Sequence, residues 1–205
     1  MKLRLFILMS VLTVFISACG VYTIQNLKPS DVKSYVGQEG GFLYGTYTFS
    51  NYSSFLDGNV ALIAGMGGKD DKEFYIEMQK EPGGSFLYFL KPGTYKITLM
   101  QYKNYWRREL YDSQMVSSTF TIKPNEITYL GSFATVADYD RTYINWGIKS
   151  VSDNADADVA SIKKDNPSLN DLAVSDETAK DIHSVVILRY YPNSSQSQKM
   201  DNKIN

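Results

Sequence analysis

Reactive side chains of two kinds are almost missing from this sequence. Its 205 residues include one cysteine, Cys19, and one histidine, His183. A single thiol cannot form an internal disulfide, and it cannot supply the several cysteine ligands of a structural zinc site. A lone histidine also leaves few ways to assemble a catalytic base with its partners. The fold must therefore be stabilised by burial of apolar groups.

An excess of charge of one sign is missing as well. The sequence has 21 Lys and Arg against 22 Asp and Glu, for a formal net charge of −1. A domain that binds nucleic acid is usually strongly basic, so this balance argues against nucleic acid as a partner. Aromatic residues are plentiful instead, with 16 Tyr and 10 Phe. Such residues favour the pleated, half-buried surface of a β-sheet.

The first twenty residues differ from the rest of the chain. Lys2 and Arg4 are followed by an almost wholly apolar run over residues 5–16. This run is shorter than the ~20 residues that a helix needs to span a bilayer. A positive start, a short apolar middle and small residues before a cleavage point are typical of a secretory signal peptide. We therefore expect residues 1–18 to be removed.

The last residues of this segment, Ile16-Ser17-Ala18-Cys19, resemble the lipobox of bacterial lipoproteins. The resemblance implies that Cys19 receives a diacylglyceryl group on its sulfur and an acyl chain such as palmitate on its amine. Several acyl chains hold a protein on a membrane almost permanently. Gly20 replaces the aspartate that retains some lipoproteins at the inner membrane, which favours the outer membrane, facing the periplasm. The remaining chain has 19 basic and 22 acidic residues, for a net charge of −3.

Short segments of alternating hydrophobicity dominate the middle of the chain. Turn signals rich in Gly, Pro and Asn separate them. This pattern predicts a mainly β fold, an antiparallel β-sandwich of the immunoglobulin-like or prealbumin-like kind. The expected strands are residues 42–50, 59–64, 73–79, 85–90, 94–102, 116–122, 127–133 and 141–149.

The composition changes after Val151. Residues 153–166 have acids at the start, lysines near the end and Pro167 after them, as expected of a helix. A second, shorter helix is expected from Ser175, and one more strand over 184–191. The predicted organisation is a tether over 19–40, a sandwich over 41–151, one or two helices and a final strand packed on it over 152–191, and a disordered tail over 192–205.

Two further segments are similar to a pattern in small bacterial lipoproteins that carry a domain of unknown function. They are Phe86-Leu87-Tyr88-Phe89-Leu90-Lys91-Pro92-Gly93-Thr94-Tyr95-Lys96-Ile97 and Phe120-Thr121-Ile122-Lys123-Pro124-Asn125-Glu126-Ile127-Thr128-Tyr129-Leu130-Gly131. The resemblance implies a β-sandwich with a Pro-Gly-x-Tyr hairpin. In such a turn proline presets φ, glycine supplies a positive φ, and the tyrosine buries its ring while its hydroxyl stays at the rim.

Few residues could carry catalysis or bind a metal. His183 is expected to be exposed or at a boundary. Asn154, Asp156 and Asp158, with Asp165 at the twelfth position, match part of an EF-hand loop, but Val159 replaces the required glycine, so acids at a helix start explain them better. Asp70-Asp71 and Asp138-x-Asp140 are expected to be turn formers in loops. We therefore predict no catalytic residue, no metal site and no cofactor.

One segment mixes tyrosine, tryptophan and arginine between two expected strands. Those residue types are enriched in binding hot spots. The candidate binding residues are Tyr102, Tyr105, Trp106, Arg107, Arg108 and Tyr111; the alternative is a long hairpin end with Trp106 packed on the sandwich rim.

The predicted function is that of a lipid-anchored, non-enzymatic envelope module that binds an envelope protein, peptidoglycan or another glycan, or that serves only as an architectural element. The alternative function is a hydrolase acting on envelope polymers, which would need a cleft with converging ionisable groups.

Overall fold

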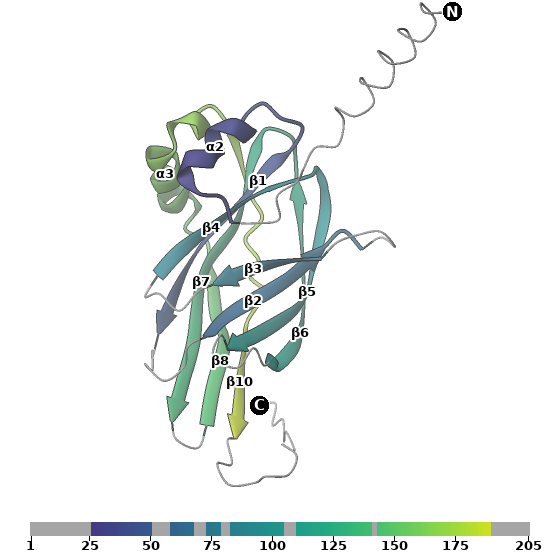
Figure 1. The fold of residues 1–205 in the computed structure, drawn as a ribbon, viewed down its shortest axis with the longest axis vertical. Helices are drawn as coiled ribbons and strands as arrows, with labels where there is room; N and C mark the ends of the chain where they lie inside the picture. The colour runs from purple at the N-terminus through teal and green to yellow at the C-terminus, as the bar shows by residue number, and fades with distance from the viewer. Residues whose placement is uncertain are drawn as a thin grey trace, which may run out of the picture.

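A computed structural model describes residues 26–50, 58–67, 73–78, 83–104, 110–140 and 143–189. These residues form two β-sheets packed face to face, with two short α-helices towards one end (Figure 1). The predicted mainly β sandwich is therefore confirmed. Among the residues described, none of the helices has the length and apolar character needed to cross a membrane.

The described strands divide between the sheets in an order unlike that of the sequence. Sheet A has the order β10-β8-β7-β1-β4, with β9 also paired to β7, and sheet B has the order β3-β2-β5-β6. In sheet A the strands are β1 (Gly41–Ser50), β4 (Gly83–Leu90), β7 (Glu126–Asp140), β8 (Tyr143–Ser152), β9 (Ala173–Asp176) and β10 (Ser184–Arg189). In sheet B they are β2 (Gly58–Gly65), β3 (Phe74–Met78), β5 (Gly93–Asn104) and β6 (Leu110–Ile122).

Sheet A is mixed rather than antiparallel. β7 runs parallel to β1 on one side and to β9 on the other, whereas the remaining described pairs in both sheets are antiparallel. The expectation of a purely antiparallel sandwich was wrong at these two pairings. Both join strands far apart in the sequence, and alternation within a strand carries no information about the direction of a distant neighbour.

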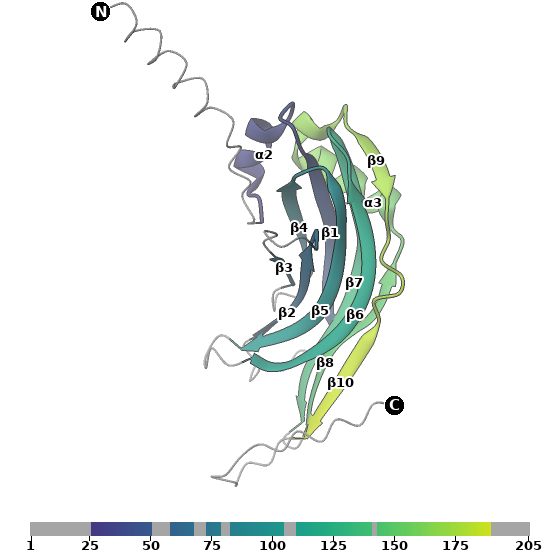
Figure 2. The same ribbon diagram turned by 90° about the vertical axis from the view of Figure 1, so that its right-hand side faces the viewer.

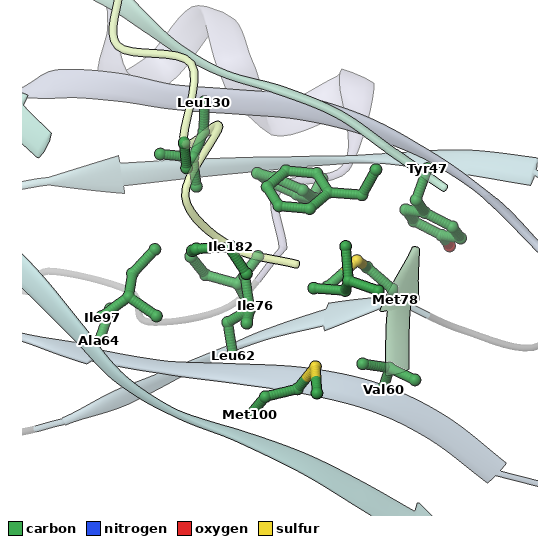
Figure 3. Close-up of a cluster of buried hydrophobic side chains, with 14 of the residues drawn as sticks. Tyr47, Val60, Leu62, Ala64, Ile76, Met78, Ile97, Met100, Leu130 and Ile182 are labelled. Atoms are coloured by element: carbon green, nitrogen blue, oxygen red, sulfur yellow. The ribbon is translucent and has the colours of Figure 1, made fainter. Parts of the chain in front are cut away.

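The main core lies between the two sheets. Leu130 of β7 faces Leu62, Ile76 and Met100 of sheet B, and Ile182, from the segment before β10, inserts beside them (Figure 3). All five side chains are essentially inaccessible to solvent. Figure 2 shows both sheets curving in the same direction, so the core follows the curve. The alternation predicted within 73–79 is confirmed, since Phe74, Ile76 and Met78 are buried.

A second, smaller core lies on the outer face of sheet A. Helix α2 (Pro29–Tyr35) and helix α3 (Ala155–Asp165), followed by the 3₁₀ turn η2 (Pro167–Leu169), cover Tyr44 of β1 and Tyr129 of β7. The cluster also contains Val32, Phe42, Leu87, Phe89, Ile127, Val159, Ile162 and Leu169. Because both faces of this part of sheet A are buried, its strands have near-continuous apolar runs instead of alternation.

A β-bulge in β5 changes which residues face the main core. Tyr95 and Ile97 point inward, but the pairing with β2 and with β6 shifts between Ile97 and Leu99. An extra residue in a strand reverses the faces of the residues that follow it. Met100 and Tyr102 are therefore fully buried, whereas Leu99, two residues after the inward-facing Ile97, is only partly buried.

The Pro-Gly-x-Tyr segment is a corner between sheets and not a hairpin within one. β4 belongs to sheet A and β5 to sheet B, so Pro92 and Gly93 carry the chain across the sandwich. Gly93 has φ +151°. The Tyr95 ring is 6% exposed and stacks on Phe120, while its hydroxyl donates to the Lys91 carbonyl at 3.0 Å. Ring and hydroxyl are placed as expected, although the turn joins different sheets.

The ends of the described chain also differ from expectation. Residues 26–36, expected to be part of a tether, lie against β4 through Leu27 and α2. Residues 173–176, where a short helix was expected to begin, form β9 because their backbone pairs with β7. The last expected strand is confirmed as β10, antiparallel to β8. The predicted signal peptide, residues 19–25 of the predicted tether, and the tail over 192–205 lie outside the described residues.

Candidate functional site

The residues predicted to bind a partner fall into two groups. Tyr102 is fully buried, and its ring lies 6.0 Å from that of Trp146 between centroids, so the bulge in β5 has turned it into the core. Tyr111 lies in β6, and nothing is described of its side chain. Tyr105, Trp106, Arg107 and Arg108 lie outside the described residues, as does Cys19. Binding by the segment and lipidation of Cys19 stay predictions.

The other candidates are dispersed. His183 is exposed, as expected, and its backbone N–H donates to the Asp181 carbonyl at 3.2 Å. Asp138 and Asp140, expected in a loop, form the end of strand β7 instead. Their Cα partners on β8 are Asn145 and Tyr143. Asp70 and Asp71 lie outside the described residues.

The acids near the start of α3 have a role that the sequence did not indicate. The Asp158 carboxylate accepts hydrogen bonds from the Tyr129 hydroxyl at 2.6 Å and from the Thr46 hydroxyl at 2.7 Å. The same Asp158 oxygen accepts both bonds, and the two donors stand on neighbouring strands, β7 and β1. Hydrogen bonds to a charged group are among the stronger ones. Asp158 therefore fixes α3 over sheet A.

Two tyrosines beside Asp158 have raised pKa values. Burial, and then the nearby charges of Asp158 and Asp165, raise the pKa of Tyr44 to about 12. Burial and the hydrogen bond to Asp158 also raise the pKa of Tyr129 above its ordinary value. Both phenols therefore stay neutral at physiological pH and act as donors or as packing groups, not as bases.

Asp158→Ala is expected to lower the free energy of unfolding by about 2–3 kcal/mol, because it leaves the buried Tyr129 hydroxyl without its acceptor. Asp158→Asn keeps an acceptor and should cost less. Asp156→Ala, an exposed acid on the same helix, is the matched control and should change stability by less than about 0.5 kcal/mol. Urea unfolding of the three variants measures this. An equal loss for Asp156→Ala and Asp158→Ala would contradict the role of Asp158.

The EF-hand alternative has no support in the described residues. Within them, no group of three or more His, Cys, Asp or Glu side chains could hold a metal ion. Asn154, the N-cap residue, makes no capping bond with its side chain, and Asp158 points to the sheet. Asp153 accepts from the Ala155 backbone N–H at 3.2 Å, as expected for an acid at a helix start.

Two open depressions lie near β9. One, about 560 Å³, is lined by Asp153, Asp156 and Asp176 with neighbouring residues of α3 and β9. The other, about 630 Å³, lies between Ser117–Thr119 of β6 and the segment Asp176–Asp181. Hydrogen bonds from Thr178 hold the pKa of Asp176 below its usual range, so this carboxylate is charged at neutral pH. Both depressions are lined by several charged side chains.

Comparison with known proteins leaves the family open. No protein-family model matches the chain, and no curated protein matches it. Among solved structures, a leucine-rich repeat protein from Bacteroides thetaiotaomicron is 15% identical, with a TM-score of 0.31, and the match covers 47% of this chain and 14% of that one. A candidate cell adhesion protein from Bacteroides ovatus is 11% identical, with a TM-score of 0.31, over 56% of this chain and 45% of that one. These are distant similarities of β-rich structure, and this chain spans less than half of either protein.

Proposed function

We propose that this protein is a lipid-anchored, non-catalytic binding module of the bacterial cell envelope, held by acyl chains on Cys19 at the outer membrane and facing the periplasm. The observation that carries the proposal is the lipobox-like Ile16-Ser17-Ala18-Cys19 sequence after a short apolar run. The seven Cα-to-Cα steps from Cys19 to Asn26 span at most about 25 Å. Asn26 is bonded to β4, so the domain would stand close to the membrane.

The described ends of the two strands that flank the candidate binding segment lie far from α2. β5 runs away from α2 and β6 returns towards it, so the connection between them, residues 105–109, follows the ends of these strands that are distant from α2 (Figures 1 and 2). Tryptophan and arginine are the residue types most enriched in binding hot spots.

Cys19→Ser in the full chain, expressed in a bacterial host, is expected to abolish labelling by a radioactive fatty acid. Nearly all of the protein should move from the membrane to the soluble fraction, since the acyl chains are its anchor. Fractionation and labelling are measured together, and Ser17→Ala, which keeps a small residue before the cysteine, is the control. A Cys19→Ser protein that is still cleaved and membrane-bound would contradict the anchor.

The binding segment is tested in the same cells. A photo-cross-linking amino acid at position 106 should give a defined adduct, and Arg107→Ala should weaken it. The same amino acid at Lys164, an exposed position on α3, is the control and should give none. An adduct pattern identical at both positions, or one that Arg107→Ala leaves unchanged, would exclude this segment as the binding site.

A further inference from the structure

The first described residues form a short segment that lies against the edge of sheet A. The Leu27 backbone N–H donates to the Leu87 carbonyl of β4 at 2.7 Å. The Asn26 side chain accepts from the Leu87 N–H at 2.8 Å and donates to the Ser85 carbonyl at 3.4 Å. Helix α2 follows and places Val32, which is fully buried, in the smaller core. We call residues 26–36 the latch.

The helix of the latch depends on its contact with sheet A. α2 has seven residues, and its N-cap residue, Lys28, makes no capping bond with its side chain. Helices shorter than about 12 residues are marginal in water without tertiary packing. The Ser34 hydroxyl donates to the Asp31 carbonyl at 2.6 Å, a bond that stays within the helix. Packing in the smaller core and the bonds to β4 therefore hold the latch in place.

Helix α3, which also covers the smaller core, is attached through charged groups. The Asp158 carboxylate accepts bonds from hydroxyl groups on β7 and β1. The Lys163 ammonium group donates to the carbonyls of Asn170 and Leu172, at 3.1 and 2.8 Å. Hydrogen bonds to a charged group are roughly twice as strong as neutral ones. The bonds between the latch and β4 join neutral groups, so we expect the latch to open before α3 does.

A hinge position follows the latch. Gly37 has φ +83°, and a Cβ at this residue would meet open space. Three residues later the chain is fixed again, because a Cβ at Gly40 would overlap the Phe89 ring. The Gly40 carbonyl also accepts from the Asn125 N–H at 2.8 Å. Rotation of the backbone at Gly37 can therefore release the latch while β1, which begins at Gly41, stays in the sheet.

We propose that the latch is a releasable part of the tether. Residues 26–36 leave sheet A as one unit, turning at Gly37, while both sheets and α3 stay folded. With the latch closed, the seven Cα-to-Cα steps from Cys19 to Asn26 reach at most about 25 Å, whereas the eighteen steps from Cys19 to Gly37 reach about 65 Å. The domain then works at two distances from the membrane. This change of reach rests on the anchor proposed above, but the release itself does not.

Hydrogen exchange of single amides, in the purified full chain in detergent and in its Cys19→Ser variant, tests the release. Leu27 and Tyr35, at opposite ends of the latch, should have the same protection factor, about a hundredfold or more below that of the β7 amides. Asn26→Ala removes the bonds to β4 and should lower both protection factors about tenfold. The amides of Asn125, beyond the hinge, and of β7 should not change. Asn154→Ala, at an exposed position outside the latch, is the control and should alter none of them.

Two results of the exchange experiment would overturn the proposal. Equal protection of the latch and of β7 would mean that the segment opens only when the whole domain unfolds. Acceleration confined to Leu27 in the Asn26→Ala variant would mean that one end frays and that no unit is released. Because the Cys19→Ser chain cannot be acylated, its exchange decides the release even if the anchor is wrong, and the anchor is decided separately by labelling and fractionation.

Force measurements test the lengthening directly. Residues 19–205 are produced without lipid and pulled between Cys19 and the cysteine of a Lys164→Cys variant, an exposed position on α3. A first extension of up to about 40 Å, the length of the eleven residues 26–36, should precede unfolding of the domain. Asn26→Ala should lower the force of this first step and leave the unfolding force unchanged. Unfolding with no earlier step would contradict the release.

Discussion

Raising the pH from 10 to 12 is expected to remove about 4 kcal/mol from the free energy of unfolding. Burial raises the pKa of Tyr44 and of Tyr88 to about 12, against an unfolded value of 10.0. A difference of one pKa unit between the folded and the unfolded state corresponds to about 1.36 kcal/mol of stability. The two phenols together therefore contribute about 5 kcal/mol to the free energy of unfolding, and most of this contribution is lost by pH 12. Since domains are typically stable by only about 5–15 kcal/mol, a large part of the stability should disappear.

The direction in which pH changes the free energy of unfolding follows from proton linkage. Between pH 10 and 12 the unfolded chain has lost these phenolic protons while the folded chain retains them, so rising pH favours unfolding. The stabilisation is complete below pH 10 and is lost as the pH passes the folded-state values. The raised pKa of Tyr129 acts in the same direction.

Urea unfolding at a series of pH values measures this effect. Tyr44→Phe should reduce the slope above pH 10 while changing little at pH 7, because Phe keeps the buried ring and removes the ionising group. Tyr75→Phe, at a ring that is 41% exposed, is the control outside the core. A stability that stays flat from pH 9 to 12, or a slope that Tyr44→Phe leaves intact, would contradict the prediction.

Gly131→Ala is expected to destabilise the fold by about 3–5 kcal/mol, as backbone strain and a steric clash act together. Gly131 lies in a β-bulge where Leu130 and Gly131 of β7 stand opposite Gly45 of β1. Its φ of +124° is nearly restricted to glycine and costs other residues about 1–3 kcal/mol. An added Cβ would also come within 2.4 Å of the Val151 Cγ1 atom, where real Cβ atoms do not approach.

Two further variants separate strain from clash. Val151→Ala in the Gly131→Ala background should recover the part due to the clash, so the pair should be less destabilising than the sum of the single changes. Gly37→Ala is the matched control: its φ is +83° and no atom lies within 4 Å of the added Cβ, so it should cost about 1–2 kcal/mol. Strict additivity of Gly131→Ala and Val151→Ala would show that the clash is absent.

Local patterns predicted local structure well. The alternation within 73–79 identified β3 and its core face, because β3 pairs regularly with β2 and one of its faces lies in the main core. The segment 42–50 identified β1, although a register shift interrupts its pairing with β7, and Phe42 and Tyr44 are buried on the other face. The acids, lysines and proline around 153–167 identified α3 within two residues of its observed ends. In each case the signal depends on residues close together in the chain.

Failures arose wherever a distant neighbour decided the structure. No local signal marks the bulge that turned Tyr102, a candidate binding residue, into the core. A short helix was expected from Ser175, but residues 173–176 form strand β9 because their backbone pairs with β7. The sequence explained Asp158 as an acid that favours the start of a helix. In the structure its carboxylate instead accepts hydrogen bonds from Tyr129 and Thr46, which hold α3 on sheet A.

By itself the sequence determined the mainly β class, the helix after Val151 and the absence of a disulfide within the chain, because composition, periodicity and a single cysteine suffice for these. Only the tertiary structure decided which strands are neighbours, that the Pro92-Gly93 turn crosses between sheets, and that Asp158 bonds α3 to β7 and β1. The physical reason is that strand pairing joins backbones, which are nearly the same in every residue, so side-chain order does not specify the partner. The proposed anchor at Cys19 rests on the sequence alone.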